Sequence, residues 1–209
     1  MNIKVCGITT MKQLQQLDGL EIDFAGLNFF KSSPRYMGDK ISKYELTDID
    51  LDIKKVGIFV NEEYEKIMQT VEDFELDVVQ LHGDETANLC EKVSSEIETI
   101  KAFRIDDASD RSIEYMIKEY DEVCDYYLFD SAHENGKGGT GKKFDWKKIE
   151  ACKIEKPFFL SGGIGPEDFL MVKKITHPDF YGVDINSRFE KEPGVKDMGL
   201  VLQFIHSLK

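Results

Sequence analysis

The chain has 209 residues, of which 41% are hydrophobic and 32% are charged, a composition typical of a soluble globular protein. No apolar run approaches the roughly 18 residues of a membrane helix, and the N-terminus lacks the apolar segment of a secretory signal. The net charge of −13, with dispersed basic residues, argues against a nucleic-acid partner, and the lack of a long apolar run argues against a membrane protein.

The four cysteines are Cys6, Cys90, Cys124 and Cys152, and no two of them form a CxxC pair. No histidine lies at zinc-finger spacing from them, so we expect neither a structural zinc site nor any other metal. A disulfide framework is not expected in a chain of this size without a signal peptide. These features predict a protein of the reducing cytoplasm.

In chain order, eight short apolar runs bounded by Gly, Asn or Asp predict strands. They cover residues 3–8, 24–30, 55–60, 77–82, 99–103, 125–130, 157–162 and 181–186. Amphipathic segments between the runs predict helices at residues 62–74, 85–95, 111–120, 166–175 and 197–208, with shorter ones at 10–18, 42–49 and 144–152. Asn61 is expected to cap the helix of residues 62–74.

Eight strands, each followed by a helical segment, predict a single α/β domain over residues 1–209, folded as a (β/α)8 TIM barrel. The alternative is an open doubly wound sheet, but no GxGxxG segment follows the first strand. The active site of such a barrel lies at the C-terminal ends of its strands. The polar residues expected there are Cys6, Asn28, Asn61, Gln80, His82, Arg104, Asp130, Ser161 and Asp184.

Three glycine-bearing segments follow the last three strands, at residues 136–146, 161–164 and 186–194. Glycine lets the backbone approach a ligand and point N–H groups at an anion, so together these segments predict a phosphate site. The residues expected to bind the phosphate are Gly139, Thr140, Gly141, Gly162, Gly163, Ser187 and Arg188. The acidic net charge does not oppose this site, because backbone N–H groups act locally.

Several motifs resemble those of the phosphoribosylanthranilate isomerase family of tryptophan biosynthesis. They are KVCGIT (4–9), LNFFKSSPRY (27–36), VGIFVN (56–61), VQLHGDE (79–85), LFDS with GGTGKKFDW (128–146), SGGI (161–164) and GVDINSRFEKEPGVKD (182–197). The match runs in order from near the first residue to the loop after the eighth strand. One departure is Asn186-Ser187-Arg188, where many family members have Ser-Gly, and Arg188 could contact the phosphate or turn outward.

The resemblance implies an Amadori rearrangement of N-(5-phosphoribosyl)anthranilate without a cofactor. The family's general base falls on Cys6, its general acid falls on Asp130, and its carboxylate-binding arginine falls on Arg35. A cysteine serves best as a base when its pKa is lowered, and an aspartate serves best as an acid when its pKa is raised. We expect the pKa of Asp130 to be raised at the barrel mouth, while the sequence leaves the ionisation state of Cys6 open.

Gln80 and His82 share one face of the fourth strand and are candidates for substrate contact, although a structural role is the first interpretation of His82 and substrate contact the second. Asp184 is a further candidate, and it could also form an ion pair with Lys4 inside the barrel.

Rival functions are a sugar-phosphate epimerase, an indole-glycerol-phosphate synthase and a non-catalytic phosphate sensor. The sequence offers no convincing lysine–glutamate set for the synthase and no metal-binding set for the epimerase, while a sensor would need neither Cys6 nor Asp130. We expect a small phosphorylated substrate as the partner, and a chain that is a monomer or a weak homodimer.

Overall fold

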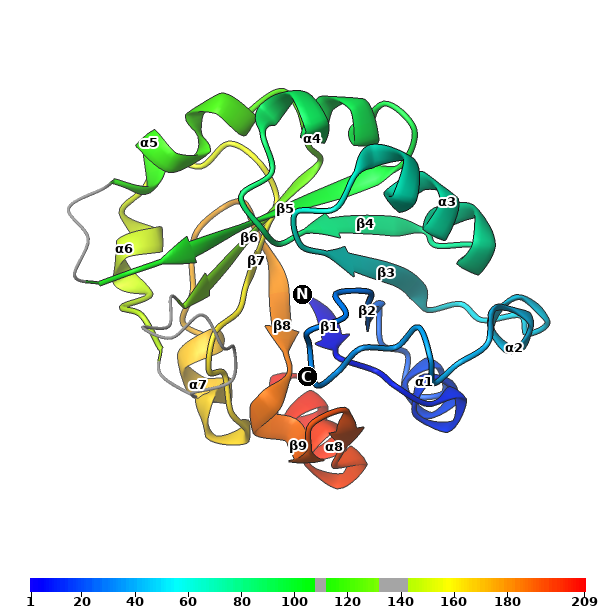
Figure 1. The fold of residues 1–209 in the computed structure, drawn as a ribbon. Coiled ribbons are helices and arrows are strands. Elements are labelled where there is room, and N and C mark those ends of the chain that lie inside the picture. The colour runs from blue at the N-terminus through cyan, green and yellow to red at the C-terminus, as the bar shows by residue number, and fades with distance from the viewer. Residues whose placement is uncertain (108–111, 132–142) are drawn as a thin grey trace.

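The computed structural model describes residues 1–107, 112–131 and 143–209. Eight parallel strands close into one barrel in the order β1 to β8, and the helices surround it (Figure 1). The strands are β1 (Asn2–Cys6), β2 (Phe24–Asn28), β3 (Lys54–Phe59), β4 (Val78–Leu81), β5 (Glu98–Ile105), β6 (Tyr126–Ser131), β7 (Phe158–Leu160) and β8 (Phe180–Ile185). The predicted (β/α)8 barrel is confirmed, and the open sheet is wrong.

The helices follow the strands in alternation. They are α1 (Met11–Asp18), α2 (Lys43–Thr47), α3 (Tyr64–Phe74), α4 (Ala87–Ser94), α5 (Ile113–Ile117), α6 (Lys147–Glu150), α7 (Phe169–Val172) and α8 (Met198–Leu208). Short 3-10 helices are η1 (Lys118–Tyr120), η2 (Pro166–Asp168) and η3 (Ser187–Phe189). After β8 the chain forms a small antiparallel pair, β9 (Glu190–Glu192) with β10 (Val195–Lys196).

Two expectations about element ends are corrected by local contacts. The first strand ends at Cys6 because Gly7 has a φ of +78°, which turns the chain away from extended geometry. Asn61 does not cap α3: the N-cap position is Glu63, without a side-chain bond. The Asn61 side chain instead accepts a hydrogen bond from the backbone N–H of Asp84, in the loop after the neighbouring strand β4.

An apolar cluster, which we call the plug, fills the lower part of the barrel, below the C-terminal ends of the strands. It consists of Phe24, Val56, Val78, Ile100, Ala102, Leu128 and Phe159, with Tyr126 and Tyr181 packed against it. The rings of Phe24 and Phe159 meet with centroids 5.4 Å apart although β2 and β7 are not neighbours, so these side chains meet across the barrel interior. A larger apolar layer separates the strands from the outer helices.

Above the plug the inward-facing side chains become polar. Side chains alternate along a strand, so the position two residues beyond Leu128 is Asp130, and the position two residues beyond Phe159 is Ser161. The same step from Val78 gives Gln80 and then His82. The strands therefore place a polar layer at their C-terminal ends, on top of a packed apolar base.

Candidate active site

Side chains from four strands gather at the C-terminal end of the barrel. Electrostatic contacts connect Lys4 with Cys6, Asp130 and Asp184, and connect Asp184 with His82. These residues come from β1, β6 and β8 and from the end of β4. The structure thus brings together the predicted thiol and carboxyl groups, which lie far apart in the sequence.

Cys6 is the last residue of β1 and is 7% exposed. Its sulfur lies beside Gly26 of β2, where a Cβ atom would come within 3.1 Å of Sγ. Burial raises the pKa of the Cys6 thiol, while the cations Lys4, Lys196 and Arg35 oppose that rise. The pKa of the thiol is therefore raised in the free protein, because loss of hydration outweighs the nearby positive charges.

Asp130 ends a polar chain that starts inside the barrel. His82 Nε2 lies 3.3 Å from Asp130 Oδ2, and His82 Nδ1 lies 2.6 Å from Gln80 Nε2. In this orientation the Gln80 amide donates to Nδ1, so the His82 proton lies on Nε2 and faces Asp130. Gln80 Oε1 is buried and has no hydrogen-bond partner among the residues that the structure describes. Gln80 and His82 thus orient the Asp130 carboxyl, whose other oxygen accepts from the Ser131 N–H.

Lys4 and Asp184 form an ion pair between neighbouring strands β1 and β8. The Nζ–Oδ1 distance is 2.9 Å, and the two side chains are 0% and 4% exposed. Burial raises the pKa of Asp184 and Lys4 opposes that rise, while Asp184 helps to hold the pKa of Lys4 above its ordinary value against the effect of burial. The predicted internal ion pair is confirmed. It lies directly below Cys6 on β1.

Arg35 stands in the loop after β2 and is held by Glu190. Its Nε lies 2.9 Å from Oε1 and its Nη2 lies 2.6 Å from Oε2 of Glu190, a bidentate pair on one edge of the guanidinium. The Arg35 side chain is 12% exposed. The edge formed by Nη1 and Nη2 is the one that Glu190 leaves to another planar anion.

Four of the seven predicted phosphate residues lie in the loops after β7 and β8. Gly162 and Gly163 have φ values of +87° and +70°, so the chain turns sharply there in a conformation that favours glycine. Ser187 begins η3 and is half-buried. Arg188 points outward, where Nη2 pairs with Oε1 of exposed Glu167 at 2.7 Å. Gly139, Thr140 and Gly141 lie outside the described residues.

Glu190 and Lys196 are buried site residues that we did not single out from the sequence. They sit on β9 and β10, within the GVDINSRFEKEPGVKD segment, which joins a strand end to the last helix. The signal available was a glutamate and a lysine in a segment that returns across the barrel mouth. Within the described parts of the chain, no three His, Cys, Asp or Glu side chains form a group that could hold a metal ion.

All four cysteines are free thiols. No helix in the described ranges has the length and apolar character needed to cross a membrane. A closed parallel barrel that gathers a thiol, a carboxyl and basic side chains at the C-terminal ends of its strands has the architecture and site of a (β/α)8-barrel enzyme.

Comparisons with known proteins specify this class further. Residues 3–207 match the family model of N-(5'-phosphoribosyl)anthranilate (PRA) isomerase. The enzyme of that name from Parabacteroides distasonis is 39% identical, with 100% of this chain and 93% of the relative covered. The chain belongs to the N-(5'-phosphoribosyl)anthranilate isomerase family.

Solved structures agree. The crystal structure of phosphoribosyl anthranilate isomerase from Thermotoga maritima has a TM-score of 0.87 and 31% identity, covering 100% of this chain and 98% of that one. A second structure, of the isomerase in complex with reduced 1-(o-carboxyphenylamino)-1-deoxyribulose 5-phosphate, has a TM-score of 0.82 and 29% identity, with the same coverage.

Proposed function

We propose that this chain isomerises N-(5-phosphoribosyl)anthranilate to 1-(2-carboxyphenylamino)-1-deoxy-D-ribulose 5-phosphate, an Amadori rearrangement of tryptophan biosynthesis, with Asp130 as general acid and Cys6 as general base. Family membership supports the reaction. The residue assignment rests on one observation. Both side chains lie at the C-terminal ends of their strands, at the same barrel mouth, and both interact electrostatically with the Lys4–Asp184 ion pair.

In the first step protonated Asp130 donates a proton to the ribose ring oxygen. The nitrogen lone pair of the substrate then forms a C=N bond as the bond between C1′ and the ring oxygen breaks, giving an open-chain protonated imine. The contact between His82 Nε2 and Asp130 Oδ2 fixes the carboxyl in place for this transfer. Gln80 Oε1, buried without a described partner, is an acceptor suited to a substrate hydroxyl.

In the second step the Cys6 thiolate removes the proton from C2′. The electron pair of that C–H bond forms the C1′=C2′ double bond and neutralises the imine nitrogen, giving an enolamine. Tautomerisation then places a proton on C1′ and leaves the ketone at C2′. No atom is gained or lost overall, so the reaction needs proton transfer alone.

The substrate is bound at two ends of the site, its carboxylate at Arg35 and its phosphate at the loops after β7 and β8. Arg35 presents the Nη1/Nη2 edge to the anthranilate carboxylate while Glu190 keeps the other edge. The phosphate lies against Gly162, Gly163 and Ser187, where the backbone turns permit close approach. Arg188 points outward and its charge is paired with Glu167, so the backbone donors of these loops are the groups left to bind the phosphate.

A turnover assay tests the proposal. Loss of fluorescence of freshly prepared phosphoribosylanthranilate is followed without added metal or nucleotide, and we expect turnover by the wild type. Cys6→Ala and Asp130→Ala should each lower kcat by at least about 100-fold, because each removes one proton-transfer group. Cys152→Ala and Asp50→Ala provide matched controls: Cys152 is only partly buried, Asp50 is exposed, and neither is among the residues placed in the site.

An unchanged kcat in Cys6→Ala would remove the assignment of the base. An inactive, folded wild type that still binds the phosphorylated product would favour the phosphate-sensor alternative. We also propose that the enzyme acts in the cytoplasm and that it is a monomer or a weak homodimer. Sedimentation over a range of protein concentrations would measure the oligomeric state.

A further inference from the structure

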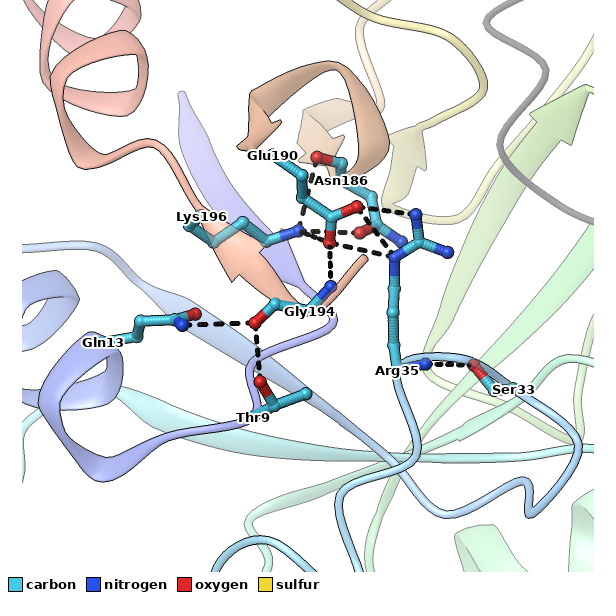
Figure 2. Close-up of polar contacts among 8 residues, drawn as sticks. All are labelled: Thr9, Gln13, Ser33, Arg35, Asn186, Glu190, Gly194 and Lys196. Carbon is cyan, nitrogen blue, oxygen red and sulfur yellow. Dashed lines mark hydrogen bonds and ion pairs between the residues drawn. The ribbon is translucent and has the colours of Figure 1, made fainter. Parts of the chain in front are cut away.

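Three charged side chains form a buried cluster beside the barrel mouth, which we call the Glu190 cluster: Arg35, Glu190 and Lys196. Figure 2 shows Glu190 between the other two, with its carboxylate facing both cations. Lys196 Nζ lies 2.7 Å from Glu190 Oε1, and the side chains of Lys196 and Glu190 are 0% and 4% exposed. The Gly194 N–H also donates to Glu190 Oε1 at 3.0 Å.

Burial lowers the pKa of Lys196 and Glu190 opposes that fall, and the hydrogen bonds of the lysine are those of an ammonium ion. Its nitrogen meets three acceptors: Glu190 Oε1 at 2.7 Å, Asn186 Oδ1 at 2.8 Å and the Asn186 carbonyl at 3.3 Å. Three acceptors match the three N–H donors of a charged lysine. Two cations against one carboxylate leave the Glu190 cluster with one positive charge in excess, in a place where charge is poorly hydrated.

The cluster adjoins Cys6 through Gly7. A Cβ on Gly7 would lie 2.6 Å from Arg35 Cδ and 2.9 Å from Asn186 Oδ1, so both side chains lie against the residue that follows the thiol. Asn186 is also the residue that holds the Lys196 ammonium. The excess charge therefore lies next to the end of β1.

The other charged groups around the thiol are one ammonium and two carboxyl groups. Lys4 of β1 and Asp184 of β8 form a neutral pair, and Asp130 of β6, which interacts with both members of it, adds no charge in the protonated form that the proposed function requires. Arg35 comes from the β2–α2 loop and Lys196 from β10, and both favour the charged form of Cys6. In the substrate-free protein with Asp130 protonated, the Cys6 thiolate is the anion that can balance the excess positive charge of the cluster.

We propose that the Glu190 cluster supplies the counter-charge of the Cys6 thiolate, with Lys196 as the positioning residue that holds this charge at the thiol. The proposal rests on the function proposed above for its catalytic meaning, since a base must be deprotonated to act. The effect of the cluster on the pKa of the Cys6 thiol does not depend on that function and is measured without substrate.

The test is the pH dependence of alkylation of Cys6 by iodoacetamide, read by mass spectrometry of the tryptic peptide of residues 5–12, which contains no other cysteine. Lys196→Met should raise the apparent pKa of Cys6 by about one unit or more, and Lys196→Arg should restore most of the wild-type value. Lys54→Met is the matched control: it also removes one positive charge, but from an exposed ion pair with Glu98 at the opposite end of the barrel. It should leave the profile unchanged.

A folded Lys196→Met protein whose Cys6 profile coincides with that of Lys54→Met would overturn the proposal. Should Lys196→Met fail to fold, Arg35→Met removes the other cation of the cluster, and a wild-type profile in that variant would equally overturn it. Failure of the proposed function is separable: full turnover by Cys6→Ala would refute the catalytic role of the thiol, while the alkylation profiles would still report its counter-charge.

Discussion

At the scale of single residues, the site sets burial against charge around Cys6. Burial raises the pKa of the thiol, and three cations offset only part of this effect. Burial of the thiol keeps water away from the place where the C2′ proton is proposed to be removed. The same burial leaves the thiol mostly protonated near neutral pH. The rate should then depend on the small fraction of thiolate.

We predict that kcat/KM rises with pH through the neutral and mildly alkaline range. A base acts when deprotonated, and the raised pKa of Cys6 places the midpoint of this limb above the ordinary thiol value of about 8.5. Initial rates at low substrate concentration, measured from mildly acidic to alkaline pH, would show the limb. Substrate deuterated at C2′ should lower kcat/KM over the same pH range, because removal of that proton is the step that the limb reports.

The residual activity of Cys6→Ala should lack this rising limb. A plateau reached below about pH 7 in the wild type would contradict the prediction, because the base would then have an ordinary or lowered pKa.

Single residues of the site differ in how far the sequence could predict them. Cys6 and Asp130 were candidates because each closes an apolar strand, and their catalytic roles came from the family resemblance, while the Lys4–Asp184 pair followed from the adjacency of the first and last strands. Glu190 was not found, because it lies 155 positions from Arg35 in the chain and only the folded loops bring them together. The raised pKa of Cys6 could not be predicted either, because it depends on burial in the folded protein.

At the scale of elements, the seam between β1 and β8 closes the barrel and depends on one glycine. Asn2 pairs with Gly182, and a Cβ on Gly182 would lie 2.1 Å from the Asn2 carbonyl oxygen. The clashing atom belongs to the backbone of β1, so the strands themselves must separate to accept a methyl group.

We predict that Gly182→Ala destabilises the protein by about 1–3 kcal/mol or more, as overpacking does in a close-packed core. Urea unfolding followed by circular dichroism would measure the loss. Gly19→Ala is the matched control: Gly19 has right-handed helical angles at the end of α1, and its added Cβ would meet nothing nearer than 3.5 Å. That variant should be neutral or slightly stabilised. Equal stability of the two variants would show that the seam is not tight.

Elements were predictable where the local pattern decides them. Each of the eight barrel strands was predicted within a few residues, because apolar runs bounded by turn-forming residues are local signals, whereas the short pair β9 and β10 was not predicted. Helix ends were less accurate: α6 covers only Lys147–Glu150, and the segment expected at 166–175 divides into η2 and α7. Asp168 explains the second case, since its carboxylate accepts from the Gly165 N–H and pairs with Lys143, holding the first turn in a tighter form.

At the scale of the whole molecule, buried ion pairs connect successive βα units where the apolar plug ends. Lys101 of β5 pairs with Glu85 in the β4–α4 loop at 2.8 Å, and their side chains are 2% and 0% exposed. Glu85 also accepts from the backbone N–H of Asn61, after β3, and of Gly83. One carboxylate thus ties together three consecutive units of the barrel.

This arrangement gives acid sensitivity to the fold. Burial alone would raise the pKa of Glu85, but Lys101 and the backbone N–H donors hold it below its ordinary value. The folded protein therefore binds this proton less readily than the unfolded chain does. The stabilisation is fully present above the ordinary glutamate pKa of about 4.3 and is lost as the pH falls through the lower folded value.

We predict that Glu85→Gln lowers the free energy of unfolding by about 3–5 kcal/mol near neutral pH, because it leaves the Lys101 ammonium buried without its counter-charge. The difference from the wild type should shrink as the pH falls below about 4, where the wild-type carboxylate becomes protonated. Urea midpoints at several pH values would measure it. Glu98→Gln removes an exposed carboxylate paired with Lys54 and should cost about 1 kcal/mol or less, with little dependence on pH in that range. A constant difference for Glu85→Gln from neutral to acid pH would show that the lost stability comes from packing, and that the charge of Glu85 does not hold the three units together.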